Sequence, residues 1–512
     1  AEGSLVSSVD LDYQSNSTDL NLAWAGSDNN SGINNYEYAL GTSKGGTETI
    51  NWANASTTSI SLASLSLTET TMYYASVRAT DKAGNVSAVI TGDGITIDLS
   101  SPIVGTVNDG LGVDIAYTSA LNSLSGNWSG FSDPVSGLSD YQYAIGTTIN
   151  GTEVKGWASN GLDTSFTYTG YELINTQVYY ISVKAIDKVG FVSDTVSSNG
   201  VISDQENPMT GFVIDGIVND EAYTNTDTIY ASWGGFADSL SGISRYEYAL
   251  GSSPGATDMI PWTDNSNLSN AALGILLKDG SSYFVSVRAV DQVGNASKVA
   301  ISNGVTADFM PPSITLLSVE ERSLIPVLGS TTIGITLSEP INNANVNILS
   351  RLGASVDFEL ELGEIPIGGF STEIFIKING PLTSKDNLTI NFKDLTDAAG
   401  NKSINKEYIY NVSLLGDYDL NGDIDIIDLN TFVNGWNTSD FVYEIGPTNG
   451  NVPNLKLVPD STYNSRDMMA FTRMWHWNTN KLSKQQTKMI ADQGTSLNAE
   501  IKADHVVFNP PK

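Results

Sequence analysis

Residues Ser31–Gly41 read Ser-Gly-Ile-Asn-Asn-Tyr-Glu-Tyr-Ala-Leu-Gly, and closely similar segments occupy Ser136–Gly146 and Ser241–Gly251. The three segments are 105 residues apart each time. A fixed period of this length indicates a tandem array of one domain rather than a single large fold. Two tryptophans recur in every copy, first at Trp24, Trp128 and Trp233 and then at Trp52, Trp157 and Trp262.

A second repeated block shows what kind of domain this is. It covers Tyr73–Asp81, Tyr179–Asp187 and Tyr283–Asp291, and in each copy apolar and polar residues alternate. A period of two places one face of a strand in a core. With other short strand-like segments separated by Gly, Asn and Ser, this predicts an antiparallel β-sandwich of about seven strands per copy. We interpret the repeated tryptophans as core residues rather than as sugar-stacking platforms.

The Ser-Gly-Ile…Tyr-x-Tyr-Ala-Leu-Gly…Trp pattern and the Tyr-x-x-Ser-Val-Arg-Ala-x-Asp-x-x-Gly-Asn block resemble fibronectin type III-like repeats of secreted bacterial surface proteins. The resemblance covers residues 1–308 and implies the fold more than the function, because such sandwiches serve many roles. The second repeat has Phe191 where its sisters have Asn85 and Asn295, so we expect its turn to be altered.

A different sandwich follows. Residues 311–413 lack Trp but keep alternating segments, and Thr336–Ile341 resembles bacterial Ig-like modules. The junctions carry Pro102, Pro208 and the pair Pro311–Pro312, which favours a stiff rod over a flexible string. The expected domains are fibronectin III-like sandwiches at 1–98, 99–204 and 205–308, an Ig-like sandwich at 309–413, a dockerin-like module at 414–480, and a linker with a strand-like tail at 481–512.

One segment carries recognisable metal chemistry. Residues 417–428 read Asp-Tyr-Asp-Leu-Asn-Gly-Asp-Ile-Asp-Ile-Ile-Asp and fit the twelve-residue calcium loop, with Gly422 at the sharp turn of position six. Calcium takes six to eight hard oxygen ligands, which this spacing can wrap around one ion. The expected calcium ligands are Asp417, Asp419, Asn421, Asp423, Asp425 and Asp428.

The loop belongs to a duplicated loop–helix unit. Asp428 is followed by Phe432 and Trp436, and Asp467 is followed at the same spacing by Phe471 and Trp475, which places each set on one face of a helix. A duplicated unit of this kind, with Asp rather than Glu at position twelve, resembles a type I-like dockerin over residues 416–477.

The second loop departs from the calcium pattern. Lys456 and Val458 fall at positions one and three and cannot ligate calcium through their side chains. The second site is therefore absent, or it borrows carboxylates such as Asp440 or Glu444.

The dockerin resemblance implies docking to a cohesin module of a scaffold or cell surface. Exposed helix residues would make the contact, and the candidates are Asn430, Asn434, Thr472 and Arg473. The alternative is that the helix pair only caps the fourth sandwich. A further hypothesis concerns the tail, where Ala499–Phe508 alternates like a strand with no partner after it in sequence. Such an orphan strand could be donated to the sheet edge of another copy and form a fibre.

Composition limits the remaining functions. The chain has 512 residues, a net charge of −32, two His and no Cys. The chain lacks the clustered Lys and Arg that nucleic-acid binding needs. Without Cys it can form neither disulfides nor a thiol-based site. It also has no apolar run long enough to span a membrane. Two segments of the Gly-x-Ser-x-Gly type, Gly41–Gly45 and Gly251–Gly255, fall in loops of β repeats and not on the strand-to-helix elbow of hydrolases. The first residue, Ala1, suggests a chain processed after secretion.

These observations predict a secreted, non-enzymatic structural and adhesive rod at the cell surface, stabilised by Ca²⁺. Its expected partner is a cohesin-like module or copies of itself, with glycans as a further class and neither nucleic acid nor a membrane span. Two alternatives stay open: a self-polymerising filament or surface-layer subunit, and the accessory region of a polysaccharide-degrading enzyme.

Overall fold

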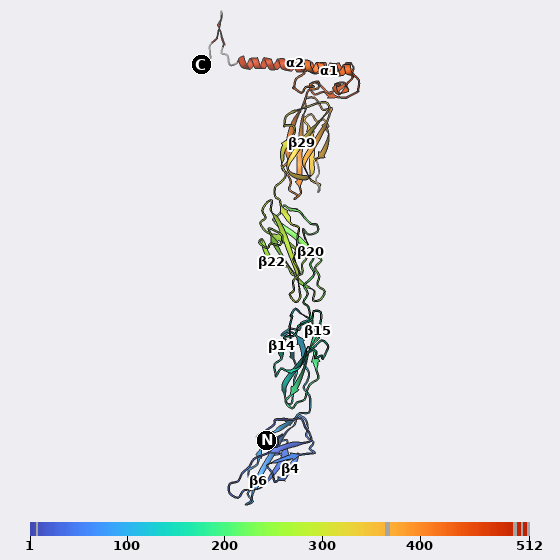
Figure 1. Ribbon diagram of the computed structural model, residues 1–512. Coiled ribbons are helices and arrows are strands. Elements are labelled where there is room, and N and C mark those ends of the chain that lie inside the picture. The colour runs from blue at the N-terminus through green and yellow to red at the C-terminus, as the bar shows by residue number, and fades with distance from the viewer. Residues whose placement is uncertain (7–8, 364–368, 495–498, 503–504, 509–512) are drawn as a thin grey trace.

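The structure is a computed structural model that describes residues 1–6, 9–363, 369–494, 499–502 and 505–508. Four β-sandwiches follow one another in a line, and a helical module lies at the far end with its long second helix running across the line (Figure 1). Each sandwich has its own buried core, except that the core of the fourth continues into the helical module.

The three repeated sandwiches share one topology, except that the smaller sheet has two strands in the first sandwich and three in the other two. In the second, a six-stranded sheet ordered β10-β17-β15-β12-β13, with β16 beside β15, faces a three-stranded sheet ordered β14-β11-β9. The strands of the first sandwich are β1 (Tyr13–Gln14), β2 (Leu20–Ala23), β3 (Ile33–Gly41), β4 (Ile50–Ala55), β5 (Ser59–Leu62), β6 (Met72–Asp81), β7 (Ile90–Thr91) and β8 (Ile95–Ile97). Those of the second are β9 (Thr106–Asp109), β10 (Tyr117–Thr118), β11 (Ser123–Ser129), β12 (Leu138–Gly146), β13 (Lys155–Ser159), β14 (Ser165–Thr169), β15 (Val178–Asp187), β16 (Val196–Ser197) and β17 (Val201–Ser203). Those of the third are β18 (Phe212–Asp215), β19 (Tyr223–Thr224), β20 (Thr228–Gly234), β21 (Ile243–Gly251), β22 (Ile260–Asp264), β23 (Asn270–Gly274), β24 (Ser282–Asp291), β25 (Ala300–Ile301) and β26 (Val305–Ala307).

The alternation predicted for the repeated block is confirmed. Along β24, Tyr283, Val285, Val287 and Ala289 are all buried in the core of the third sandwich. Because successive side chains of a strand point to opposite faces, the intervening residues lie on the other face of the sheet.

The two tryptophan series differ. Trp128 and Trp233 are buried core residues, as predicted. The second series is not in the core, which corrects the expectation. Each of these tryptophans is partly exposed, and a cation from two strands away in the same sheet lies over its ring: Arg78 over Trp52, Lys184 over Trp157 and Arg288 over Trp262.

The turn of the second repeat keeps its backbone despite Phe191, contrary to expectation. One carboxylate oxygen of Asp187 accepts hydrogen bonds from the amides of Val189, Gly190 and Phe191. Backbone donors make this turn, so a change of side chain leaves it in place. In the third repeat, Asn295 also donates its side-chain amide to the second oxygen of Asp291. Phe191 has no such donor for Asp187.

The fourth sandwich is built around one long strand. Strand β29 pairs with β31 through its first half and with β32 through its second, so it serves both parts of the sandwich. The strands are β27 (Ile314–Leu317), β28 (Leu324–Ile325), β29 (Ser330–Ser350), β30 (Asp357–Leu362), β31 (Ser371–Asn379), β32 (Asn387–Asp397) and β33 (Lys406–Val412).

The helical module contains α1 (Ile426–Thr438), the short helix η1 (Phe441–Tyr443), the strand pair β34 (Thr448–Asn449) and β35 (Lys456–Leu457), and α2 (Ser465–Gly494). Residues 481–494, expected as a linker or short helix, continue α2 as a single helix. Among the described residues, none of the helices combines the length and apolar character needed to span a bilayer.

The tail also differs from the expected orphan strand. Strand β36 (Ala499–Lys502) pairs with β37 (His505–Phe508) as an antiparallel hairpin, so its strands are each other's partners. Residues 495–498, 503–504 and 509–512, which include Pro510 and Pro511 of the predicted tail, lie outside the described residues.

Candidate metal centre

The predicted calcium loop brings three of its acidic side chains together. Asp417 and Asp428 are 3% and 0% exposed, Asp419 is exposed, and carboxylate oxygens from all three lie within 4.8 Å of one another. Asp417 comes from the segment that leaves the fourth sandwich, and Asp428 lies in the first turn of α1. An all-oxygen set of hard carboxylates fits calcium better than the transition metals.

Backbone amides hold this loop in shape. The two carboxylate oxygens of Asp417 accept from the amides of Asn421 and Gly422, both at 3.1 Å. Asp428 accepts from Tyr418 N at 2.7 Å and from Asp425 N at 2.9 Å, and with Asp425 it forms a capping box on α1. Gly422 has a φ of 93°, a left-handed conformation that glycine adopts without steric cost.

The remaining predicted ligands have other contacts. Asn421 accepts from the amide of Asp423 and donates its side-chain amide to Asp419. Asp425 accepts from Ile427 N as the N-cap of α1. The structure therefore gathers Asp417, Asp419 and Asp428, while Asn421, Asp423 and Asp425 line the loop around them.

Electrostatics at the loop favours a cation. Burial raises the pKa of the Asp417 carboxyl to about 7, and the neighbouring Asp428 and Asp419 carboxylates add to the rise. Burial likewise raises the pKa of Asp428. Neutralisation by a bound cation would stabilise both groups in the charged form.

The second loop uses its carboxylates differently. Asp467 accepts from the amides of Ile445, Gly446 and Asn464. Glu444 is buried and accepts from the amides of Asp460 and Ser461. Neither these two residues nor Asp440 joins any carboxylate cluster among the described residues. Glu444 thus contacts this loop, but it binds backbone amides and joins no carboxylate cluster among the described residues.

The equivalent phenylalanines of the two helices pack on each other. Phe432 of α1 stacks on Phe471 of α2 with ring centroids 5.0 Å apart and an interplanar angle of 12°. The four residues predicted to contact a partner, Asn430, Asn434, Thr472 and Arg473, are all exposed.

The helical module is packed against the fourth sandwich rather than tethered to it. Its buried residues, including Phe432, Phe471 and Leu455, belong to the same hydrophobic core as strands β29, β31 and β32. The amide of Ser384 donates to the carbonyl of Leu455 at 2.8 Å. The helix pair therefore also caps the sandwich, and this role does not occupy its exposed face.

Four more carboxylate clusters occur in the described part of the chain. One lies at the N-terminus, where Glu2, Asp10 and Asp93 meet, and the α-amino group is 4.0 Å from the carboxylates of Glu2 and Asp10. The other three lie at the junctions between successive sandwiches. Sequence reasoning missed these junction clusters, although their residues recur at nearly the period of the repeats.

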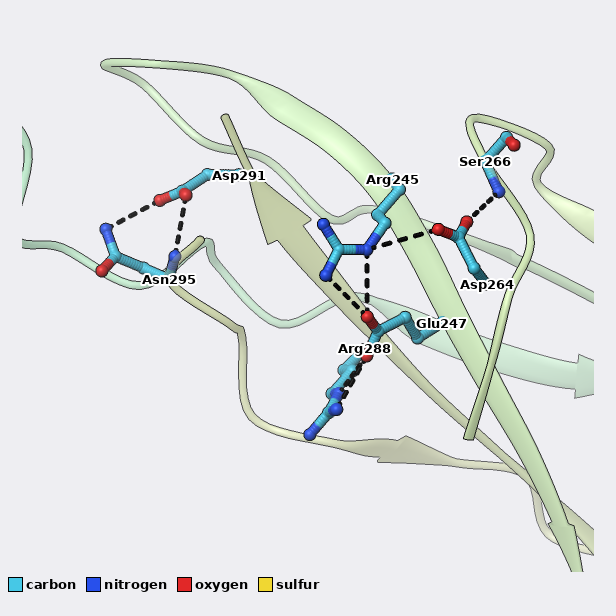
Figure 2. A network of polar contacts seen from close by, with 7 residues as sticks. All are labelled: Arg245, Glu247, Asp264, Ser266, Arg288, Asp291 and Asn295. Carbon is cyan, nitrogen blue, oxygen red and sulfur yellow. Dashed lines mark hydrogen bonds and ion pairs between the residues drawn. The ribbon is translucent and has the colours of Figure 1, made fainter. Parts of the chain in front are cut away.

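Charged residues on the open face of the third sandwich form ion pairs. Figure 2 shows Glu247 between Arg245 and Arg288, with contacts of 2.8 and 2.7 Å, and Asp264 beside Arg245. Because Arg288 also covers Trp262, the ring face that a sugar would need is already occupied.

The first sandwich has an open groove of about 620 Å³, lined by Trp24, Tyr36 and Val77 among others. In the second and third sandwiches, Val107 and Val213 lie opposite the equivalent tryptophans in the sheet. In the described part of the first sandwich, no strand residue lies opposite Trp24 on this side. The groove is thus the space that a strand fills in the sister domains.

Comparison with known proteins gives modest likenesses. No protein-family profile matches the chain. Exoglucanase B of Cellulomonas fimi is 27% identical over 365 residues, which make up 69% of this chain and 29% of the enzyme. The chain thus spans less than a third of that relative.

Two solved structures are similar in part. The chicken CNTN1 FN1–FN3 domains are 17% identical with a TM-score of 0.25, and the match covers 57% of this chain and 95% of that one. The fibronectin(III)-like modules of Clostridium thermocellum CbhA are 15% identical with a TM-score of 0.26, covering 40% and 94%.

Proposed function

We propose that this chain is a non-catalytic extracellular rod whose C-terminal loop–helix pair binds calcium and docks the rod to another protein. The observation that carries the proposal is the convergence of Asp417, Asp419 and Asp428, within 4.8 Å, at the start of α1. The four sandwiches provide length, and the module at their end provides attachment.

Calcium would act on the docking face through α1. Asp428 is both a candidate ligand and an acceptor for the amides of Tyr418 and Asp425. An ion held by Asp428 therefore fixes the loop and the first turn of the helix together. Two of the candidate contact residues lie in α1 and two lie in α2. The distance between the two pairs therefore depends on how α1 packs against α2.

A protein partner is favoured by apolar side chains beside the candidate contact residues. Ile426 and Ile427 of α1 are 62% and 54% exposed, and Met469 of α2 is 63% exposed. Exposed apolar groups next to polar ones are typical of protein contact surfaces. The dockerin resemblance suggests a cohesin-like module as the partner.

Two experiments test this proposal. Calorimetric titration of the full chain with calcium should show a site that Asp417→Asn removes and Asp460→Asn, in the second loop, does not. Immobilised cohesin modules should then retain the chain in calcium and release it in chelator. Equal calcium binding by the two variants would refute the loop site, and retention unchanged by chelator would refute calcium-dependent docking.

The filament alternative requires a strand of one copy to pair with a sheet edge of another. Light scattering after size exclusion, in millimolar calcium and in chelator, tests it. Large particles that disappear when residues 495–512 are deleted would support strand donation. A monomer under both conditions would contradict it.

The accessory-region alternative is favoured by the likeness to an exoglucanase. It predicts the same docking behaviour together with a catalytic domain elsewhere in the parent protein. Titration with soluble β-glucans distinguishes glycan binding from spacing. We expect no binding at the Trp52, Trp157 and Trp262 faces, because cations cover them.

A further inference from the structure

We infer that a calcium ion binds at the first and the third of the three junctions between successive sandwiches and joins neighbouring domains. These sites are separate from the loop at Asp417–Asp428 and do not depend on it. Each junction gathers one carboxylate from the upstream sandwich and two from the downstream one. The three sets are Asp98, Asp133 and Asp187; Asp204, Asp238 and Asp291; and Asp308, Glu339 and Asp397.

The members of a set come from equivalent places in the fold. At the first junction Asp98 follows β8 of the upstream sandwich, Asp133 lies in the loop after β11, and Asp187 ends β15. Oxygens from the three side chains lie within 4.8 Å of one another. Calcium–oxygen bonds are about 2.3–2.6 Å long, so two oxygens on opposite sides of one ion lie about 5 Å apart.

Unpartnered oxygens point to a missing ligand at the first junction. One oxygen of Asp187 accepts three loop amides, one of Asp133 accepts the amides of Val135, Ser136 and Gly137, and one of Asp98 accepts from Ser100. The second oxygen of each residue is buried and has no hydrogen-bond partner. Asp98 and Asp187 are only 0% and 1% exposed. Buried acceptors without donors are rare in folded proteins, because they are costly.

Cationic side chains do not fill this gap. None of the ion pairs in the described part of the chain includes a junction carboxylate. Lys188, the neighbour of Asp187 in sequence, places its ammonium group over the ring of Tyr13 in the first sandwich. Three like charges in a buried space without a counter-charge repel one another, and a divalent cation would remove that repulsion.

The ligand chemistry selects calcium. All three side chains offer carboxylate oxygens, with no imidazole or thiolate, which excludes a site of the usual zinc or copper type. Calcium accepts irregular oxygen shells and completes them with backbone carbonyls and water, whereas magnesium demands a near-ideal octahedron.

The other two junctions vary the same arrangement. At the second, Asn295 donates to the second oxygen of Asp291 at 2.8 Å and to the carbonyl of Asp204 at 3.2 Å; Figure 2 shows Asn295 beside Asp291. This amide takes the place of an ion: none of the three carboxylates at this junction has a buried oxygen without a hydrogen-bond partner, so the inference does not extend to it. At the third junction, the second oxygen of Asp397 is again buried and unpartnered.

The consequence is a rod whose joints respond to calcium. Because the ligands of each site come from both sides of a joint, the ion can be held only while the two sandwiches are docked. Removal of the ion leaves repelling carboxylates across the joint, which favours bending.

The inference is tested by measuring how many calcium ions the full chain binds. In an Asp417→Asn background, which removes the loop site, calorimetric titration with calcium in excess magnesium should still show binding. Adding Asp187→Asn should lower the stoichiometry by one, whereas adding Asp163→Asn, an exposed acid of the same sandwich, should not. No binding in the Asp417→Asn background, or unchanged binding with Asp187→Asn, would overturn the inference without affecting the loop site.

A second variant guards against misfolding. Asp98→Asn removes the ligand from the other side of the same joint, and it should cause the same loss as Asp187→Asn. Small-angle scattering of the Asp417→Asn chain should show a shorter maximum dimension in chelator than in calcium. Identical scattering curves in the two conditions would refute the stiffening role.

Discussion

The first loop–helix unit, 417–436, and the second, 456–475, both end in Asp-x-x-x-Phe-x-x-x-Trp, yet their carboxylates have different partners. In the first, Asp428 accepts from two backbone amides and also lies beside two other carboxylates. In the second, Asp467 meets three backbone amides. The comparison teaches that a carboxylate surrounded by N–H donors stabilises a loop by itself, whereas one surrounded by other carboxylates needs a cation.

The same contrast separates the first two junctions. Asp291 has both oxygens satisfied by its own turn, with Asn295 as the second donor. Asp187 has one oxygen satisfied and the other left open, because Phe191 stands in the equivalent position. One side chain in otherwise similar repeats thus decides how a buried charge is compensated.

The largest expected effect is the loss of calcium stabilisation in the first loop. A ligand at 1,000 times its Kd stabilises the folded state by about 4 kcal/mol. The fourth sandwich and the helical module share one core, and Asp417→Asn should reduce their calcium-dependent rise in Tm to the part that the third junction contributes. Differential scanning calorimetry in calcium and in chelator measures it, with Asp467→Asn as the variant that should keep the rise.

The second expected effect is calcium-independent. Asp467→Asn takes an acceptor from buried amides and should lower stability by about 1–3 kcal/mol. The loss should be equal in calcium and in chelator, because no ion is involved. A loss confined to calcium-containing buffer would show that the second loop binds calcium after all.

The third prediction concerns a variant that gives the first junction the asparagine found at the second. Phe191→Asn should supply the missing donor to Asp187 and raise the stability of the metal-free second sandwich by about 1 kcal/mol. The same change should weaken calcium binding at this joint. Phe191→Ala is the control, since it removes the ring without adding an amide; an equal rise in Tm for both variants would contradict the explanation.

The smallest expected effect concerns buried carboxylates outside the clusters. Burial raises the pKa of Asp109 and of Asp215 to about 6, with Asp114 and Asp220 adding to the rise. A raised carboxyl pKa means that the folded state binds more protons than the unfolded state between about pH 4 and 6. Stability contributed by these groups is therefore present at low pH and is lost as the pH rises through 6.

In chelator, lowering the pH from 7 to 5 should stabilise the second and third sandwiches by about 1 kcal/mol for each of these groups. The double variant Asp109→Asn, Asp215→Asn should show a smaller change over the same interval. The measurement is the melting temperature at several pH values. If Tm changes equally with pH in the variant and the parent chain, the pH dependence does not come from Asp109 and Asp215.

The sequence alone was sufficient for the repeated sandwiches, since a 105-residue period and strict alternation depend only on residues close in the chain. The same is true of the loop at 417–428, where a twelve-residue spacing brings its own ends together. It was insufficient for Trp52 and its equivalents, whose covering cations lie two strands away in the sheet. Nor could it show that 481–494 continues α2, because a polar sequence leaves little periodic signal.

Contacts between domains were decided by the tertiary structure. Asp98 and Asp187 are far apart in sequence and meet only because one sandwich docks on the next. Glu444 reaches the second loop, and the helix pair shares a core with the fourth sandwich, for the same reason. Local patterns fix strands, turns and loops through neighbouring residues, but the compensation of a buried charge depends on everything around it in space, which a one-dimensional pattern does not contain.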